Sequence, residues 1–387
     1  MKPDGRVRSR LVVKDFKQGG GVGEGMEYFS PTPSQVSNLI LEAWALEKGH
    51  KMQMMDVSAA FMHSELQEEV YVKPPPEAEV APGHCWRLKK AMHGLRSAAK
   101  SWQDHAANIL KKLNYTRSQV DPCLYVHKDK DAALTIHVDD LNLAGTPEKR
   151  AMTIAGLAEQ LIIKSTKPLE PGDSFRVLGF HKSIGADGSI HTTIDQNHIK
   201  SLKEIVFNNC PEGKAIKGSG IPGTKVKNEA EEQTPLSPEK HAAYRKALGI
   251  LQWISKVRGD IKFSVKELGK DLAKPSEGSW TRLKKLTRYL ISSSDVGRET
   301  SAKVKIEEVK CFTDSDWAGG TATRRSTSGG IIALGPMRKG GPETLENCAV
   351  IAEWSKTQPT IAQSSGEAET YAVVKGTSES LFCKAVL

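Results

Sequence analysis

A short segment that carries two adjacent aspartates constrains the fold of this chain more than any other. Residues 133–138 have the alternation of a strand, and residues 141–145 resume the pattern after Asp139 and Asp140. The two aspartates therefore fall where the chain reverses direction in a tight hairpin and presents their side chains to solvent. Aspartate also favours ordinary turns through local hydrogen bonds, so the pair needs support from other segments.

Two adjacent carboxylates repel each other, and a pair of divalent cations removes that repulsion. A third carboxylate, Asp56, closes an apolar stretch far upstream of Asp139 and Asp140. Cations held about 3.5–4 Å apart by shared carboxylates can activate an attacking hydroxyl and stabilise a leaving pyrophosphate. Hard oxygen ligands favour two Mg²⁺ ions, with Mn²⁺ as an alternative. The sequence therefore predicts that the three aspartates converge on one two-metal site.

Composition limits the class of protein. The chain has 387 residues, of which 38% are hydrophobic and 26% charged, as in a soluble globular protein of two or three domains. A net charge of +9 favours a polyanionic partner such as nucleic acid, although the same residues can also form only a solvated face. The scattered cysteines argue against a zinc module and for a reducing compartment. The first residues lack an apolar segment and no run reaches about 18 apolar residues, so export and membrane insertion are disfavoured.

Local composition also predicts loops and helices. The glycines at 19–23 predict a loop, and residues 217–223 together with the charged run 225–240 are the best linker candidate. Helices are predicted at 97–113, 244–257 and 280–291 by apolar residues at helical spacing. Beyond residue 301 the pattern shifts to short strands with glycine and serine turns, which predicts a further unit.

Two of these helices bear on function. Trp102 belongs to the apolar stripe of the first, which is interpreted as core rather than ligand surface. The last helix carries Arg282, Lys284, Lys285 and Arg288 around a leucine stripe. A basic helix of this kind either follows a phosphate backbone or is simply solvated on its outer face.

Several segments occur in the order seen in copia-type retrotransposon reverse transcriptases. The chain resembles this family over essentially its whole length. The segments that carry the resemblance are 10–14, 29–31, 55–61, 88–95, 121–125, 137–140, 177–179, 244–249, 312–319, 325–329 and 364–369.

The resemblance implies a fold and a domain organisation. The fold class is α+β, a right-hand polymerase with fingers, palm and thumb, followed by a partial ribonuclease H-like α/β unit. Residues 1–210 would form the reverse transcriptase fingers and palm, 211–300 the linker, thumb and connection, and 301–387 a truncated ribonuclease H-like domain. Residues 177–179 are similar to the family's turn beside the primer terminus.

The resemblance also implies an activity. The chain would be an RNA-directed DNA polymerase that transfers nucleotides to a primer 3′-hydroxyl, with Asp56, Asp139 and Asp140 as catalytic metal ligands. Its partners would be an RNA or DNA template with primer and deoxynucleoside triphosphates. No membrane would be among its partners. It would act inside the cell, in a cytoplasmic particle or in the nucleus.

Three further residues would shape the nucleotide site. Arg10 aligns with the arginine that contacts the triphosphate, and guanidinium suits phosphate oxygens. Phe61 aligns with the ring under the nucleotide sugar, where bulk excludes a 2′-hydroxyl. An exposed basic residue and an ordinary core phenylalanine are the alternatives for these two positions. Ser97 stands where the family has a glutamine in the nucleotide site, and its side chain is too short for the same contacts.

Other departures keep a second hypothesis open. His137 replaces the usual tyrosine before the hairpin, Ser64 replaces a glycine, and no proline stands between Arg258 and Asp260. None of these changes removes a metal ligand, yet together they resemble drift in an element copy. The alternative is a catalytically impaired relic that acts at most as a nucleic-acid-binding module.

The C-terminal part carries the remnant of a second site. Asp314 matches the first ribonuclease H carboxylate and Glu369 the second, and the next family aspartate would lie beyond Leu387. Two carboxylates leave a pair of divalent ions poorly neutralised and poorly positioned. We therefore expect no ribonuclease H activity.

Overall fold

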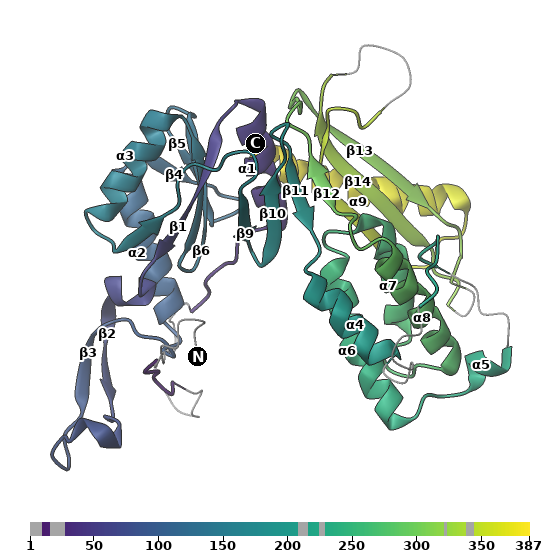
Figure 1. Cartoon of the computed structure of the whole chain (residues 1–387), viewed down its shortest axis with the longest axis horizontal. Coiled ribbons are helices and arrows are strands. Elements are labelled where there is room, and N and C mark those ends of the chain that lie inside the picture. The colour runs from purple at the N-terminus through teal and green to yellow at the C-terminus, as the bar shows by residue number, and fades with distance from the viewer. Residues whose placement is uncertain (1–9, 16–27, 208–215, 224–228, 321–322, 338–343) are drawn as a thin grey trace. The chain divides into compact units, whose positions relative to one another are not determined.

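The computed structural model describes residues 10–15, 28–207, 216–223, 229–320, 323–337 and 344–387 (Figure 1). The glycine loop predicted at 19–23, the boundary at 210/211 and residues 225–228 of the charged run lie outside these residues. The chain divides into two compact units. Unit 1 runs to Leu41 and continues over Gly49–Leu169, and unit 2 comprises Glu42–Lys48 and Glu170–Ala385. The three domains inferred from the resemblance stay a prediction.

Unit 1 is built on a six-stranded antiparallel sheet with the order β4-β5-β6-β7-β1-β8. Hydrophobic side chains of the central strands pack with those of α2 and α3 in one core cluster. Residues at the alternate positions of these strands face the other side of the sheet, where Thr135 of β6 donates a hydrogen bond to Asn38 of α1 (2.8 Å). The central strands are therefore buried on both faces, which explains their nearly continuous burial. The elements are the first part of α1 (Gln35–Glu47, whose residues from Glu42 on belong to unit 2), β1 (Lys51–Val57), α2 (Ala98–Lys112), β4 (Tyr115–Arg117), β5 (Leu124–His127), β6 (Ala132–His137), β7 (Asp140–Gly145), α3 (Pro147–Ala158) and β8 (Ile163–Ser165).

A separate two-stranded ribbon extends from this unit (Figure 1). Its first strand shows the strict alternation of a ribbon with one covered face. A short 3-10 helix, η1 (Ala60–His63), links β1 to this ribbon. The ribbon elements are β2 (Glu65–Val72), η2 (Pro76–Ala78) and β3 (Trp86–Lys90).

Unit 2 contains a second antiparallel sheet, ordered β12-β11-β10-β9, and a group of packed helices. The predicted helices at 244–257 and 280–291 are confirmed as α6 and α8. The elements are β9 (Ser174–Val177), β10 (Phe180–Ile184), β11 (Ile190–Thr193), α4 (Gln196–Phe207), α5 (Glu229–Gln233), α6 (Pro238–Ile254), η3 (Gly259–Ile261), α7 (Lys262–Lys270), α8 (Glu277–Ser292) and β12 (Arg298–Thr300).

The linker prediction is wrong at its C-terminal end. Residues 216–223 hold no helix or strand, as expected, but the charged run that follows includes α5 and the first turn of α6. Helix α6 begins early because the Ser237 hydroxyl accepts from the Lys240 N–H and Pro238 occupies the first helical position. These capping signals outweigh the missing apolar period.

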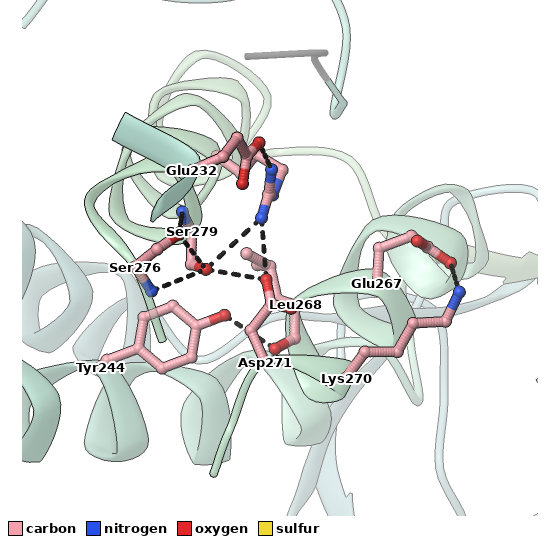
Figure 2. A network of polar contacts seen from close by, with 9 residues as sticks. Glu232, Tyr244, Glu267, Leu268, Lys270, Asp271, Ser276 and Ser279 are labelled. Carbon is pink, nitrogen blue, oxygen red and sulfur yellow. Dashed lines mark hydrogen bonds and ion pairs between the residues drawn. The ribbon is translucent and has the colours of Figure 1, made fainter. Parts of the chain in front are cut away.

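A polar network joins three of these helices (Figure 2). Asp271, just after α7, accepts hydrogen bonds from Ser279 Oγ and Arg282 Nη2 of α8, both at 2.8 Å. Arg282 also forms an ion pair with Glu232 of α5. The guanidinium is thus held inside the helical group, so this residue does not support the interpretation of α8 as a helix that follows a phosphate backbone.

The C-terminal part of unit 2 is a three-stranded antiparallel sheet with one long helix. The strands have eight or nine residues, so the prediction of short strands is wrong here. Helix α9 packs closely on β13, because a Cβ at Gly376 would lie 2.5 Å from Thr313 Cγ2. In the described part of the chain, none of the helices has both the length and the apolar character needed to cross a membrane. The elements are β13 (Glu308–Ser315), β14 (Thr327–Gly335), β15 (Ala349–Thr357) and α9 (Ser365–Val386).

The described elements form a mixed α+β structure with several antiparallel sheets, which confirms that part of the predicted fold class.

Candidate active site

The aspartate pair lies at a tight and strained hairpin. His137 at the end of β6 pairs with Asp140 at the start of β7, so Val138 and Asp139 form the loop. Val138 has a φ of 53°, in the left-handed region that β-branched residues rarely adopt. Such a conformation costs about 1–3 kcal/mol and persists only where the surrounding structure imposes it.

Two hydrogen bonds impose this conformation. Trp102 Nε1 on α2 donates to the Val138 carbonyl at 2.6 Å. The backbone N–H of Val57, at the end of β1, donates to the Asp139 carbonyl at 2.8 Å. Trp102 is buried, as its place in the apolar stripe predicted, but its contact with the turn was not predicted. The available signal was the indole N–H, which needs an acceptor when buried.

Strand pairing brings the third carboxylate to the hairpin. Asp56 on β1 lies directly opposite Asp140 on β7 in the antiparallel register. Directly paired residues have Cβ atoms about 4.5–5.5 Å apart. Asp139 precedes Asp140 in the loop, and all three residues are exposed, although the Asp140 carboxyl group is partly desolvated. The sheet order therefore unites residues that are distant in sequence at one exposed edge.

Electrostatic repulsion is evident at this edge. Partial burial raises the pKa of Asp140, and the charges of Asp139 and Asp56 raise that pKa further, while His137 opposes them. Clustered hard oxygen donors whose charges repel one another are the donor set that a divalent cation neutralises. The three residues thus fit a magnesium site, with their exposure leaving room for substrate phosphates as further ligands.

A different set of side chains lies close enough together to bind a metal ion. Among the described residues, only His127, Asp129 and Asp131 place one ligand atom each within 4.8 Å of the others. The Lys149 ammonium lies 2.8 Å from Asp129 Oδ2 and 3.7 Å from Asp131 Oδ2, and so neutralises this set. We interpret it as an ion-pair network. Asp56, Asp139 and Asp140 do not meet this distance criterion, and among the described residues no lysine or arginine forms an ion pair with them.

The repulsion predicts a pH-dependent effect on stability. Because the folded state raises the pKa of Asp140, it binds this proton more tightly than the unfolded chain does. Ionisation of Asp140 therefore destabilises the fold at neutral pH, and this penalty disappears as the pH falls. We expect D140N to stabilise the metal-free protein at pH 7 by at most about 1 kcal/mol, because solvent screens exposed charges. Urea denaturation at pH 7 and pH 4 measures this: a gain that is equal at both pH values would contradict it.

The proposed nucleotide-site residues lie on or near the loop 91–97, between β3 and α2. Phe61 on η1 is half-buried, and its ring contacts the His93 ring edge-on, with the two ring centroids 4.9 Å apart. The Val13 N–H donates to the His93 carbonyl at 2.8 Å, and Val13 and Phe61 pack on the same small core cluster. Arg10 is exposed three residues before this contact. Ser97 precedes α2, and its buried hydroxyl has no hydrogen-bond partner among the described residues.

The two carboxylates that the resemblance assigns to a ribonuclease H site lie on neighbouring elements, β13 and α9. Asp314 is exposed near the end of β13, and the backbone N–H of the next residue, Ser315, donates to Glu369 Oε1 of α9 at 3.2 Å. Asp316 Oδ1 accepts from the Thr327 N–H at 2.7 Å, which is a structural role beside the turn.

Comparisons with known proteins identify the class of protein to which the chain is similar. Residues 1–182 match the family model described as reverse transcriptase (RNA-dependent DNA polymerase). The chain is 27% identical to the retrovirus-related Pol polyprotein from transposon RE2 of Arabidopsis thaliana, over 97% of this chain and 24% of that protein. It is 25% identical to the corresponding polyprotein from transposon TNT 1-94 of Nicotiana tabacum, over 100% of this chain and 28% of that protein. It is 21% identical to the transposon Ty1-NL2 Gag-Pol polyprotein of Saccharomyces cerevisiae, over 89% of this chain and 20% of that protein.

The matched segment belongs to the reverse transcriptase family. Over nearly its whole length the chain is a distant homologue of the reverse transcriptase region of copia-type retrotransposon Pol polyproteins, which confirms the resemblance seen in the sequence. The chain spans about a quarter of the length of the plant relatives.

Proposed function

We propose that the chain is the RNA-directed DNA polymerase of a copia-type retrotransposon, acting inside the cell in a cytoplasmic particle or in the nucleus. The observation that carries the proposal is the pairing of Asp56 with Asp140 at the strained hairpin. The substrates would be a primed RNA or DNA template and deoxynucleoside triphosphates.

Each residue of the site has a proposed role. Asp56, Asp139 and Asp140 would hold two Mg²⁺ ions, or Mn²⁺, which when bound lower the pKa of the primer hydroxyl and neutralise charge on the triphosphate. The Phe61 ring would meet the nucleotide sugar and exclude a 2′-hydroxyl. Arg10 would donate to triphosphate oxygens.

The test is primer extension by the purified chain on a primed RNA template. We expect weak extension with deoxynucleotides that requires Mg²⁺ or Mn²⁺ and stops with a chelator. Ribonucleotides should be poor substrates if Phe61 acts on the sugar. Extension that survives complete chelation of divalent metal would contradict the proposal.

A catalytically impaired relic that only binds nucleic acid is the second candidate. The unpartnered Ser97 hydroxyl favours it, because a buried polar group without a partner is unfavourable. Ser64, by contrast, is well accommodated, since its hydroxyl donates to the Phe61 carbonyl at 2.8 Å. Salt-sensitive binding of template and primer without any extension would support this candidate.

Trp102 gives a prediction about the turn. We expect Trp102→Phe to keep most of the buried packing but lose the hydrogen bond to Val138, at a cost of about 1 kcal/mol in the free energy of unfolding. Because the turn then shifts relative to the substrate, kcat for extension should fall about tenfold or more. Trp86→Phe, in the ribbon strand β3, is the matched control and should extend primers at the wild-type rate. Equal kcat values for both variants would show that the hydrogen bond does not position the turn.

We also propose that the C-terminal part of the chain is a ribonuclease H-like unit that cannot cleave an RNA–DNA hybrid by itself. Glu369 accepts a hydrogen bond from the backbone N–H of Ser315, the residue after Asp314, and Asp316 is engaged in its turn. Two carboxylates leave the geometry for in-line attack incomplete. Hybrid cleavage with Mg²⁺ measures this: robust cutting that disappears in Asp314→Asn would overturn the expectation.

A further inference from the structure

The β9–β10 hairpin of unit 2 closes in a strained turn. Val177 pairs with Phe180, which leaves Leu178 and Gly179 as the loop. Both loop residues have positive φ, 50° and 80°, a combination that asparagine and glycine adopt readily and leucine does not. A leucine stays in this conformation only where its surroundings impose it.

Trp253, near the end of α6, supplies that constraint. Its ring is stacked on Phe180, with centroids 4.8 Å apart and an interplanar angle of 6°. Its edge also lies beside the loop, because a Cβ at Gly179 would be only 3.3 Å from Trp253 Cζ2. One half-buried aromatic side chain therefore connects the turn to the helices of unit 2.

The surface around the turn suits a polyanion. Gly179 is exposed, so the loop backbone is accessible at this point. The Lys256 ammonium lies 4.5 Å from the centroid of the Trp253 ring, and this lysine is also exposed. A positive charge beside an accessible backbone can approach a nucleic-acid phosphate.

We propose that Trp253 is a positioning residue, which fixes the Leu178–Gly179 turn against which the primer strand is placed. The inference rests on the proposed polymerase function and on the resemblance of residues 177–179 to the turn beside the primer terminus. Small displacements of a reacting group lower the rate steeply. Loss of the indole therefore lowers the rate of incorporation, while KM for the nucleotide, whose proposed ligands lie in unit 1, stays nearly constant.

Four variants test this role. Trp253→Ala removes the ring, and Trp253→Phe restores an aromatic face. Gly179→Ala disturbs the same turn from the other side, because its φ is 80° and the added Cβ meets the indole. Phe263→Ala on α7 is the matched control. The Lys266 ammonium lies 4.5 Å from the centroid of the Phe263 ring, as Lys256 does from Trp253, and Phe263 is 54% exposed.

Two readouts are combined: hydrogen exchange over residues 174–184, and single-nucleotide incorporation on a primed template. We expect Trp253→Ala and Gly179→Ala to speed the exchange and to lower kcat about tenfold or more, with KM for the nucleotide unchanged within about twofold. Trp253→Phe should recover most of kcat, and Phe263→Ala should match the wild type in both readouts.

The outcomes separate the two proposals. An active wild type whose Trp253→Ala and Gly179→Ala variants keep the wild-type kcat overturns the role of Trp253 and leaves the polymerase intact. A wild type that never extends primers overturns the polymerase, and with it the placement of the primer. If hydrogen exchange over residues 174–184 is unchanged in both variants, Trp253 does not constrain the turn, whether or not the wild type extends primers. Should Trp253→Ala fail to fold, the exchange of Gly179→Ala alone decides this point.

Discussion

Asp139→Asn and Asp140→Asn should each lower primer extension by about 10³-fold or more. An amide keeps the size of the side chain but loses the negative charge that binds a divalent cation. Metal ions contribute several kcal/mol of transition-state stabilisation, and about 1.4 kcal/mol corresponds to a factor of ten in rate. Asp56→Asn should have an effect of the same order, because Asp56 lies directly opposite Asp140.

The measurement is single-turnover extension at saturating Mg²⁺ and again at saturating Mn²⁺. Asp129→Asn, in the ion-pair network with Lys149, is the matched control and should keep the wild-type rate. Template–primer binding by all variants should stay within a few-fold, because phosphate contacts come from basic residues. Extension by Asp140→Asn at the wild-type rate would remove the catalytic assignment.

The aspartate hairpin could be predicted from the sequence because it depends on local properties. Strand alternation on both sides of Asp139 and Asp140 leaves room for only a short loop, and the structure has the pairing of His137 with Asp140. The approach of Asp56 is a long-range strand pairing, which periodicity cannot specify. That expectation came from the requirements of two-metal chemistry and from the family resemblance.

Contacts between distant segments could not be predicted in the same way. The departure at Gly259 resembles drift in the sequence, yet a Cβ at this position would lie 2.0 Å from Glu353 Oε2. Glu353 in turn forms an ion pair with Arg298. A carboxylate from β15 therefore occupies the space beside Gly259, and a larger residue there would displace it. Such mutual adjustment appears only when the strands and helices are packed.

Arg258, the residue before Gly259, makes more hydrogen bonds than any other buried cationic side chain described in unit 2. Arg258 has a side-chain exposure of 1% and forms a bidentate pair with Asp260, at 2.8 and 2.7 Å. It also donates to the Ser293 carbonyl at 2.6 Å and to the Ser293 hydroxyl at 3.0 Å. Burial acts to raise the pKa of Asp260, but the hydrogen bonds from Arg258 and Tyr289 lower it overall. The guanidinium thus ties the end of α6 to the end of α8.

Arg258→Met should therefore lower the free energy of unfolding by about 2–3 kcal/mol, because it leaves the Ser293 carbonyl and the partly exposed Asp260 carboxylate without their partner. Arg288→Met is the matched control on α8: its guanidinium is exposed and lies over the Phe207 ring, so its removal should cost no more than about 1 kcal/mol. Urea denaturation measures both variants, with the midpoint expected to fall at an unchanged slope. The penalty should also shrink at low pH, because the depressed pKa of Asp260 makes its stabilising contribution disappear as the carboxylate is protonated. An Arg258→Met midpoint equal to that of Arg288→Met would show that this pair does not hold the helices together, whatever its geometry.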